Sequence, residues 1–293
     1  IPILDRDRRV IGVISPPPMK DNERDWATVN SDAVSALEEE RDGAPHDRSN
    51  KRTKNMGLNL EEEHRRGDFK AKGTGFSASG GMEYAKCVYH DRKTAKALRR
   101  LQENPTFIRI AGHASAIFAT WAPNLYTFYG KYMDQVLEHN PSIYYNFPNS
   151  IFASATYNFG PWTVLLEHID HLNYIYGWCS ITAFGSYDFT KGGHLILFDL
   201  RMVIEFPPCW TILIPSSYLR HGNTDIAPGE KRFSFTQYTS GSLFRYVDDH
   251  YRMRTQMSPS ERKETELKQR ERMKADLNLY STLDELKDLY HLV

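Results

Sequence analysis

Residues 192–241 of this 293-residue chain read GGHLILFDLRMVIEFPPCWTILIPSSYLRHGNTDIAPGEKRFSFTQYTSG. Short runs rich in Ile, Leu, Phe and Thr are separated by Gly, Pro, Asn and Asp, which is the pattern of short strands joined by turns. The same texture extends upstream to residue 151 through runs such as SATYNF, TVLLEHID and GWCSITAFG. Regularly spaced short strands of this kind predict an antiparallel β-sandwich or barrel.

Helical patterns flank this region on both sides. Between residues 107 and 140, aromatic and aliphatic side chains recur at helical intervals, as at Phe118 and Leu125, which predicts helices that pack against a sheet. The segment 251–293 carries alternating charge and predicts a surface helix with Ser260 as its N-cap. The fold class expected is therefore α+β, with a β core flanked by helices.

The first part of the chain has a looser composition. The run Pro16–Pro18 and a polar stretch without periodicity predict a partly irregular arm that wraps the surface. The glycine-rich segment Gly73–Gly81 matches neither the phosphate-loop nor the dinucleotide-binding spacing, so we expect a flexible loop that contacts substrate. The predicted division is an N-terminal arm (1–72), a basic glycine-rich loop with supporting helices (73–150), the β core (151–250) and a helical tail (251–293).

Composition narrows the class of protein. The 37 Lys and Arg balance the 37 Asp and Glu, and hydrophobic residues make up 40% of the chain, as in ordinary globular proteins. Apolar runs stay below the roughly 18 residues that span a bilayer, and the first residues lack the order of a signal peptide. Three cysteines, Cys87, Cys179 and Cys209, are too few for a disulfide framework. We therefore exclude a membrane protein and a disulfide-rich secreted domain.

Charge is nevertheless distributed unevenly along the chain. Residues 46–100 contain 14 Lys and Arg against seven Asp and Glu, an excess that suits a phosphate-facing surface. A solvated face or a flexible loop would have the same composition, so charge alone leaves both interpretations open.

A metal site is indicated inside the β region. The pair His168-Ile-Asp170 ends the strand-like run 163–170. Residues two apart in a strand point to the same face, so imidazole and carboxylate can bind one ion. His221 follows the apolar run 211–215 in a polar, turn-like segment, from which it could reach that pair. Two histidines and one carboxylate are the ligand set of non-haem Fe(II) oxygenases, which leaves positions open for a co-substrate and oxygen.

Each of these residues also has an ordinary interpretation, with His168 and Asp170 as a structural pair and His221 as a surface loop residue. Zinc hydrolases use similar ligands, but they commonly carry two histidines in an HExxH helix, which this sequence lacks. The order and the strand placement of the three residues together favour iron.

The tripeptide Arg232-Phe-Ser234 lies in the last clear strand of the region. The period of two puts Arg232 and Ser234 on one face and the neighbouring phenylalanines on the other. An inward arginine is costly unless it meets a carboxylate, and no acid lies near it in this strand. The co-substrate 2-oxoglutarate would supply that carboxylate, and the serine hydroxyl would add a hydrogen bond. A glutamate from elsewhere in the chain is the alternative partner.

With these residues, the sequence resembles the Fe(II)/2-oxoglutarate dioxygenases of double-stranded β-helix (jelly-roll) fold, and within them the TET/JBP oxygenases of nucleic-acid bases, particularly fungal members. The resemblance covers about residues 105–250 and is best in the stretch quoted above. It implies a jelly-roll core with Fe(II), 2-oxoglutarate and O2 as cofactors. It also implies His168, Asp170 and His221 as metal ligands, and Arg232 and Ser234 as the 2-oxoglutarate anchor.

Two local motifs of that family imply contacts with a flipped base. Three residues after the metal aspartate the family has an amide or acid that contacts the base, here Asn173. After the Arg-x-Ser motif it has an aromatic residue that stacks on the base, here Tyr238, for which core packing is the alternative. The family often has a histidine two residues later, where this chain has Ser240. Cytosine would then be recognised differently, or the base is another one, such as methylated adenine.

Asn158 and Thr163, together with Arg109 further upstream, are polar candidates for other 2-oxoglutarate contacts. The resemblance implies a nuclear, monomeric enzyme that flips a modified base out of double-stranded DNA and oxidises its methyl group. The outcome would be 5-methylcytosine oxidation, N6-methyladenine demethylation, or both. An oxygenase acting on a protein or a small molecule is one alternative, and a non-catalytic DNA-binding jelly roll with a decayed metal site is another.

Overall fold

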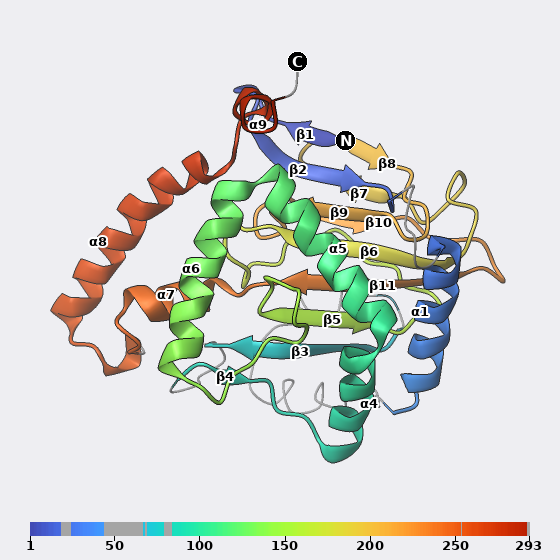
Figure 1. The fold of residues 1–293 in the computed structure, drawn as a ribbon, viewed down its shortest axis with the longest axis horizontal. Helices are drawn as coiled ribbons and strands as arrows, with labels where there is room; N and C mark the ends of the chain where they lie inside the picture. Colours follow the sequence, from blue (N-terminus) through green and yellow to red (C-terminus); the bar gives the residue numbers. More distant parts are fainter. Residues whose placement is uncertain (19–24, 44–66, 68, 79–83, 253, 292–293) are drawn as a thin grey trace.

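The computed structural model describes residues 1–18, 25–43, 67, 69–78, 84–252 and 254–291. Its centre is an eight-stranded antiparallel sheet (Figure 1). In spatial order the strands are β1 (Pro2–Leu4), β2 (Val10–Ser15), β9 (Thr211–Ile214), β6 (Cys179–Ser186), β11 (Lys231–Tyr238), β5 (Ser154–Asn158), β3 (Ala71–Ser77) and β4 (Lys86–Cys87). A second, three-stranded antiparallel sheet has the order β10 (His221–Asn223), β7 (Leu195–Leu197) and β8 (Met202–Ile204).

Helices cover one face of the large sheet, in front of the strands in Figure 1. These are α1 (Trp26–Glu40), α4 (Arg92–Glu103), α5 (Pro105–Trp121) and α6 (Pro123–His139). The remaining helical segments are α7 (Gly241–Asp248), the short η1 (Arg254–Gln256), α8 (Pro259–Asp276), η2 (Leu277–Leu279) and α9 (Leu283–Leu289). The expected α+β class, a β core with flanking helices, is confirmed. In the described part of the chain no helix is long and apolar enough to cross a membrane.

The side-chain alternation of β11 separates the two faces of the sheet. Phe233 and Phe235 are fully buried beneath the helices, and the Phe235 ring lies 5.3 Å from that of Phe107 on α5. Arg232, Ser234, Thr236 and Tyr238 therefore point to the opposite face, since successive strand residues alternate. β5 repeats this alternation, because its residues pair directly with those of β11. The helical face is thus aromatic, and the other face is polar.

The N-terminal residues differ from the irregular arm that the sequence suggested. The run VIGVIS forms β2, which pairs with β9, and β1 adds the outermost strand of the large sheet. α1 buries Val29, Ala33 and Leu37 against the helical layer. The apolar spacing in these segments is satisfied by long-range pairing, which composition alone does not reveal. Residues 44–66, also assigned to the arm, lie outside the described residues.

The glycine-rich segment Gly73–Gly81 was expected to be a flexible loop, and this was wrong for residues 73–77. They belong to β3, which pairs with β5 across the predicted boundary at residue 72. Gly75 has φ +111°, and a Cβ there would lie 2.1 Å from the Ala153 carbonyl oxygen. Glycine at position 75 therefore allows the backbones of residues 75 and 153 to approach each other closely. Residues 79–83, the rest of the segment, lie outside the described residues.

Three local expectations also need correction. The run 163–170 forms no strand and meets the second sheet only through isolated bridges and single hydrogen bonds. His221, expected in a turn-like segment, begins strand β10. At the start of α8 the capping residue is Ser258 rather than Ser260, because Ser258 Oγ accepts from the Glu261 amide while the Glu261 carboxylate accepts from the Ser258 amide, which is the capping-box arrangement.

Candidate metal centre

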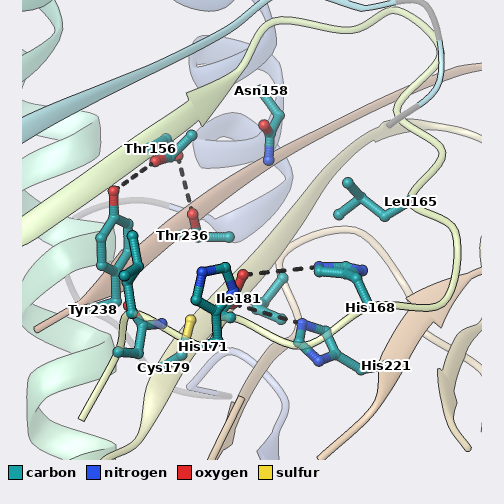
Figure 2. Close-up of a pocket in the computed structure, with 13 residues that line it drawn as sticks. Thr156, Asn158, Leu165, His168, His171, Cys179, Ile181, His221, Thr236 and Tyr238 are labelled. Carbon is teal, nitrogen blue, oxygen red and sulfur yellow. Dashed lines mark hydrogen bonds and ion pairs between the residues drawn. The ribbon is translucent and has the colours of Figure 1, made fainter. Parts of the chain in front are cut away.

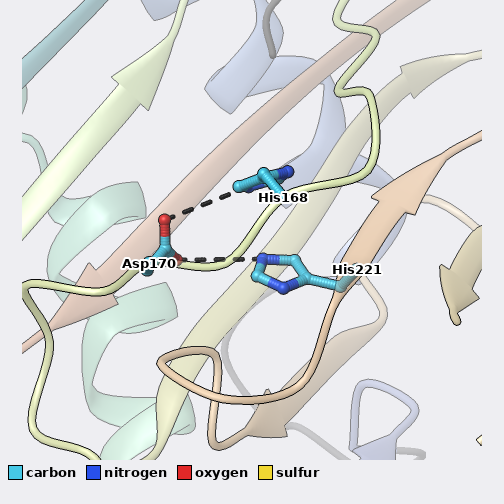
Figure 3. Close-up of side chains that lie close together, drawn as sticks. All are labelled: His168, Asp170 and His221. Atoms are coloured by element: carbon cyan, nitrogen blue, oxygen red, sulfur yellow. Dashed lines mark ion pairs between the residues drawn. The ribbon is translucent and has the colours of Figure 1, made fainter. Parts of the chain in front are cut away.

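His168, Asp170 and His221 converge on one point (Figure 3). One potential ligand atom from each residue lies within 4.8 Å of the other two. The Asp170 carboxylate is central, with Oδ1 3.9 Å from His168 Nε2 and Oδ2 3.8 Å from His221 Nε2. Two imidazole nitrogens and a carboxylate on one side of a point make a three-residue facial ligand set.

Backbone pairing brings the two histidines together. The His168 amide donates to the His221 carbonyl oxygen at 3.1 Å, and the His221 amide donates to that of His168 at 3.0 Å. This bridge fastens the irregular segment 163–170 to the start of β10. The Asp170 amide donates to the Ser216 carbonyl oxygen at 2.9 Å, which fixes the third residue. The positions of the three residues are therefore set by main-chain contacts.

The same local geometry fixes both imidazole rings. His168 Nδ1 lies 2.7 Å from the Leu166 carbonyl oxygen, and His221 Nδ1 lies 2.8 Å from the Leu219 carbonyl oxygen. A carbonyl oxygen can only accept a hydrogen bond, so each Nδ1 carries a hydrogen, and Nε2 is the ring nitrogen left to bind a metal. Both Nε2 atoms face the Asp170 carboxylate. This outer-shell arrangement is typical of histidines that bind metals.

A cavity of about 260 Å³ opens beside these residues (Figure 2). It lies between the polar face of the large sheet and the segment that carries His168 and Asp170. The Asp170 side chain is 30% exposed, whereas that of His221 is only 3% exposed. The lining residues are Thr156, Asn158, Leu165, His168, Asp170, His171, Leu172, Asn173, Cys179, Ile181, His221, Thr236 and Tyr238.

Tyr238 and Asn173, the two residues predicted to contact a base, both line this cavity. Tyr238 Oη lies 3.1 Å from Thr156 Oγ1, and a Cβ on Gly73 would lie 3.3 Å from the same hydroxyl. Gly73 of β3 thus leaves room for the Tyr238 hydroxyl. Asn173 Nδ2 donates to Ser216 Oγ at 3.1 Å. The backbones of Asn173 and Ser240 form a β-bridge. Ser240, which occupies the position of the family histidine, therefore holds the turn that carries Asn173.

Arg232 and Ser234 lie on the same face but do not line the cavity. Arg232 is 2% exposed, and its Nη1 donates to the carbonyl and hydroxyl oxygens of Thr163 at 3.1 and 3.0 Å. Among the described residues no carboxylate pairs with the guanidinium, and its Nε has no hydrogen-bond partner. Burial lowers the pKa of Arg232 below its usual value, and the contacting Tyr187 side chain opposes that shift.

These observations fit a small dicarboxylate. A buried guanidinium without an acidic partner is expensive and leaves donors unused, so an incoming carboxylate would compensate it. Asn158 lines the cavity, and its Nδ2 donates to Ser234 Oγ at 2.8 Å. Asn158 therefore links the cavity to the buried pair of Arg232 and Ser234. Thr163 supports the guanidinium through its backbone and hydroxyl oxygens.

One sequence-based candidate lies elsewhere, and another is only partly described by the structure. Arg109 is on α5, on the helical side of the sheet, with its guanidinium 5.0 Å from the Trp26 ring, so the suggested 2-oxoglutarate contact is wrong. The basic stretch 46–100 is described only in part. Within it, Leu98 and Leu101 of α4 pack in the cluster that contains Phe233, so the charged side of α4 faces away from the cavity.

Several cavity residues were not anticipated from the sequence. His171 and Leu172 follow Asp170 directly, and Cys179 begins β6. Burial raises the pKa of the Cys179 thiol, with the Asp170 charge as a second cause, so it stays protonated. Thr236 could have been found from the period of two, because it lies between Ser234 and Tyr238. Tyr187, beside Arg232, had no signal in the sequence.

Comparisons with known proteins bear on the fold. No family model matches the chain, and no curated protein matches it significantly. Among solved structures, NgTET1 in complex with 5mC DNA is similar at 15% identity with a TM-score of 0.52, covering 82% of this chain and 76% of that one. The chain therefore has the fold of that TET structure, which confirms the resemblance at the level of fold.

Two further structures show weaker likeness. The viral collagen prolyl hydroxylase vCPH from Paramecium Bursaria Chlorella virus-1, solved as a 2OG complex, has a TM-score of 0.24 at 14% identity, covering 29% of this chain and 57% of that one. A 2OG-Fe(II) oxygenase family oxidoreductase from Burkholderia pseudomallei has a TM-score of 0.36 at 13% identity, covering 77% and 96%. Both likenesses are too weak to add to the conclusion on fold.

Proposed function

We propose that this protein is an Fe(II)- and 2-oxoglutarate-dependent dioxygenase that oxidises the methyl group of a modified base in DNA. The observation that carries the proposal is the convergence of His168, Asp170 and His221 within 4.8 Å beside a cavity. The buried guanidinium of Arg232 on the same sheet face, which pairs with no carboxylate in the described part of the chain, supports it. On this proposal the two antiparallel sheets correspond to the double-stranded β-helix of such oxygenases.

The donor set favours iron over other metals. Two imidazoles with one carboxylate suit Fe(II). Structural zinc sites have four protein ligands, and zinc hydrolases with a similar set commonly carry both histidines on one HExxH helix, whereas His168 lies in an irregular segment and His221 in β10. Among the described residues no fourth His, Cys, Asp or Glu joins the cluster. Fe(II) with 2-oxoglutarate and oxygen supplies the oxidation of an unactivated methyl group, and this chemistry belongs to the cofactors. The protein contributes placement, protonation state and exclusion of water.

Arg232 and its neighbours would hold the far carboxylate of 2-oxoglutarate. The guanidinium still has Nε to donate, and Thr163 holds the Nη1 end in place. Ser234 and Asn158 add a hydroxyl and an amide on the same face. A charge-assisted hydrogen bond at a buried site is among the stronger polar contacts in proteins. This anchor would orient the keto-acid end toward the three metal ligands.

The substrate would enter as a single base. A methyl group inside a duplex cannot approach a buried metal centre, so the nucleotide must rotate out of the stack. Tyr238 offers an aromatic ring in the cavity, and Asn173 offers an amide that can donate to and accept from a base edge. Thr156 and Thr236 add hydroxyls to the same wall. The likeness of fold to NgTET1 in complex with 5mC DNA supports a nucleic-acid substrate.

The chemistry at the methyl group depends on the base. Oxidised 5-methylcytosine would remain as a stable hydroxymethyl product, whereas an oxidised N6-methyl group would leave the base by collapse of the hemiaminal. This chain has Ser240 at the position of the histidine that the resemblance associates with cytosine. The Ser240 hydroxyl is hydrogen-bonded to the Leu172 carbonyl oxygen and to the Ser242 hydroxyl. Both bases are therefore included in the proposal. A chromosomal substrate would place the protein in the nucleus.

The experiment is to measure succinate release from 2-oxoglutarate with Fe(II) and oxygen, in the presence of methylated or unmethylated duplex DNA. Release that depends on the methyl group supports the proposal. Release that depends only on a peptide or a metabolite would replace it with the protein or small-molecule oxygenase. A protein that takes up no iron would instead be a binding domain. Asp170→Ala is the control that separates enzymatic turnover from free iron chemistry.

A further inference from the structure

Three large aliphatic side chains are exposed on the segment that carries the metal ligands. Leu172 is 57% exposed, Leu166 is 56% exposed and Ile169 is 38% exposed. They flank His168 and Asp170 in the sequence, so they lie around the ligands rather than on a distant surface. Single exposed apolar residues are ordinary, so the position of each one relative to the cavity decides whether it can contact a substrate.

Leu172 differs from the other two in position. It lines the cavity, whereas Leu166 and Ile169 do not. It also lies between Asp170, a metal ligand, and Asn173, the residue assigned to the base edge. Leu165 and Ile181 also line the cavity, but Leu165 is only partly exposed and Ile181 is buried. Leu172 is therefore the aliphatic side chain of the lining that is most open to solvent.

The backbone of Leu172 is held firmly although its side chain is exposed. Its carbonyl oxygen accepts from the Gly241 amide at 2.9 Å and from Ser240 Oγ at 3.2 Å. The Asn173 amide closes the turn by donating to the Asp170 carbonyl oxygen at 2.9 Å. The turn is thus fastened to the end of β11 and the start of α7. A side chain presented on such a turn has little backbone entropy to lose when it meets a partner.

We propose that Leu172 is the residue that enters the DNA duplex and fills the space left by the flipped base. This inference rests on the proposed function. Removing one base exposes the flat faces of its two neighbours, and apolar wedge residues reduce that cost by restoring contact. Leu172 has the required chemistry, a rigid mount and a place at the entrance to the base cavity. The exposed Leu172 side chain would then contact the two bases that border the gap in the opened duplex.

The test compares the oxidation of one methylated oligonucleotide in three forms: paired duplex, duplex with a mismatch at the target base, and single strand. Opening the target is costly only in the paired duplex, because a mismatched or unpaired base needs little or no opening. Leu172→Ala should lower kcat/KM on the paired duplex roughly tenfold, about 1.4 kcal/mol, and change it less than about twofold on the single strand. Leu172→Met, which keeps the apolar bulk, should restore the duplex activity.

Leu166→Ala is the matched control, since it removes the same side chain at the same exposure from the same segment. It should leave the ratio of duplex to single-strand activity unchanged. An equal loss on all three substrates, no loss on any, or the same pattern for Leu166→Ala would each overturn the assignment of Leu172. Those results leave the proposed function standing, because the wild-type protein still oxidises methylated DNA. Wild-type protein that turns over peptide and none of the three DNA forms overturns both.

Discussion

His168 and His221 exchange two backbone hydrogen bonds, and their imidazole rings lie 4.3 Å apart between centroids. The pairing places both side chains without using the imidazole atoms themselves. Each Nδ1 is occupied by a carbonyl oxygen two residues earlier, which leaves both Nε2 atoms for a metal. Changing one ring should therefore remove a ligand while the surrounding backbone keeps its arrangement.

Iron binding provides the first prediction. His168→Ala should reduce Fe(II) affinity by more than the roughly 10–100-fold that loss of an outer-shell partner causes, because it removes a direct ligand. Equilibrium dialysis under anaerobic conditions measures this. His171→Ala is the control, since His171 is the adjacent histidine in the same cavity but lies outside the ligand cluster. Equal iron loss in both variants would contradict the ligand assignment.

The guanidinium of Arg232 gives the second prediction. Arg232→Met should weaken 2-oxoglutarate binding by about 2 kcal/mol or more, roughly thirtyfold, because a buried carboxylate would lose its charged partner. Its thermal stability without 2-oxoglutarate should be equal or higher, since an uncompensated buried charge is removed. Thermal unfolding with and without 2-oxoglutarate measures both effects, because a ligand raises Tm only if it binds the folded state.

Lys231→Met is the matched control for this experiment. Lys231 is the neighbouring cation in the same strand, but it pairs with Glu38 of α1. This variant should keep the full 2-oxoglutarate-induced rise in Tm. A rise that also persists in Arg232→Met would show that the co-substrate is anchored elsewhere.

Tyr238 provides the third prediction, because its ring and its hydroxyl can be separated. Base–aromatic stacking contributes about 1–3 kcal/mol per base, so Tyr238→Ala should lower turnover of methylated DNA by roughly 5- to 150-fold. Tyr238→Phe keeps the ring and loses the contacts of the hydroxyl, among them the one with Thr156 Oγ1, and should stay close to wild type. Both should retain 2-oxoglutarate consumption without DNA. If the phenylalanine variant is as impaired as the alanine variant, the tyrosine acts through its hydroxyl and not by stacking.

The cysteines allow a fourth prediction, on pH dependence. Burial raises the pKa of Cys179 above its usual range and that of Cys209 to about 12. A raised pKa means that less thiolate is present at any pH below it, and the thiolate is the reactive form. At pH 8 iodoacetamide should therefore label the partly exposed Cys87 before the other two. Mass spectrometry of the labelled peptides would contradict this if Cys179 were modified first.

The sequence was informative where one strand or one short motif is enough. The alternation of β11 correctly separates Arg232 and Ser234 from the phenylalanines, because a period of two is local geometry. The convergence of His168, Asp170 and His221 was predicted from residue types and spacing. The reason given for His168 and Asp170 was wrong, however, since their segment is an irregular chain fixed by a bridge to β10.

Long-range pairing accounts for what the sequence did not predict. β1 and β2 join β9, and β3 joins β5, through partners far away in the chain. Gly73 was interpreted as part of a flexible loop, whereas it makes room for the Tyr238 hydroxyl of another strand. The turn that carries Leu172 is held by hydrogen bonds from Ser240 and Gly241, which lie far along the chain. None of these relationships has a local signature in the sequence.

The most direct measurement is nucleoside mass spectrometry of a methylated duplex after incubation with the protein, Fe(II), 2-oxoglutarate and oxygen. One duplex should carry 5-methylcytosine and another N6-methyladenine. The account predicts a hydroxylated or demethylated base that forms in step with succinate and is absent with Asp170→Ala. Methylated bases that remain intact in both duplexes, while iron and 2-oxoglutarate are bound, would contradict a DNA substrate.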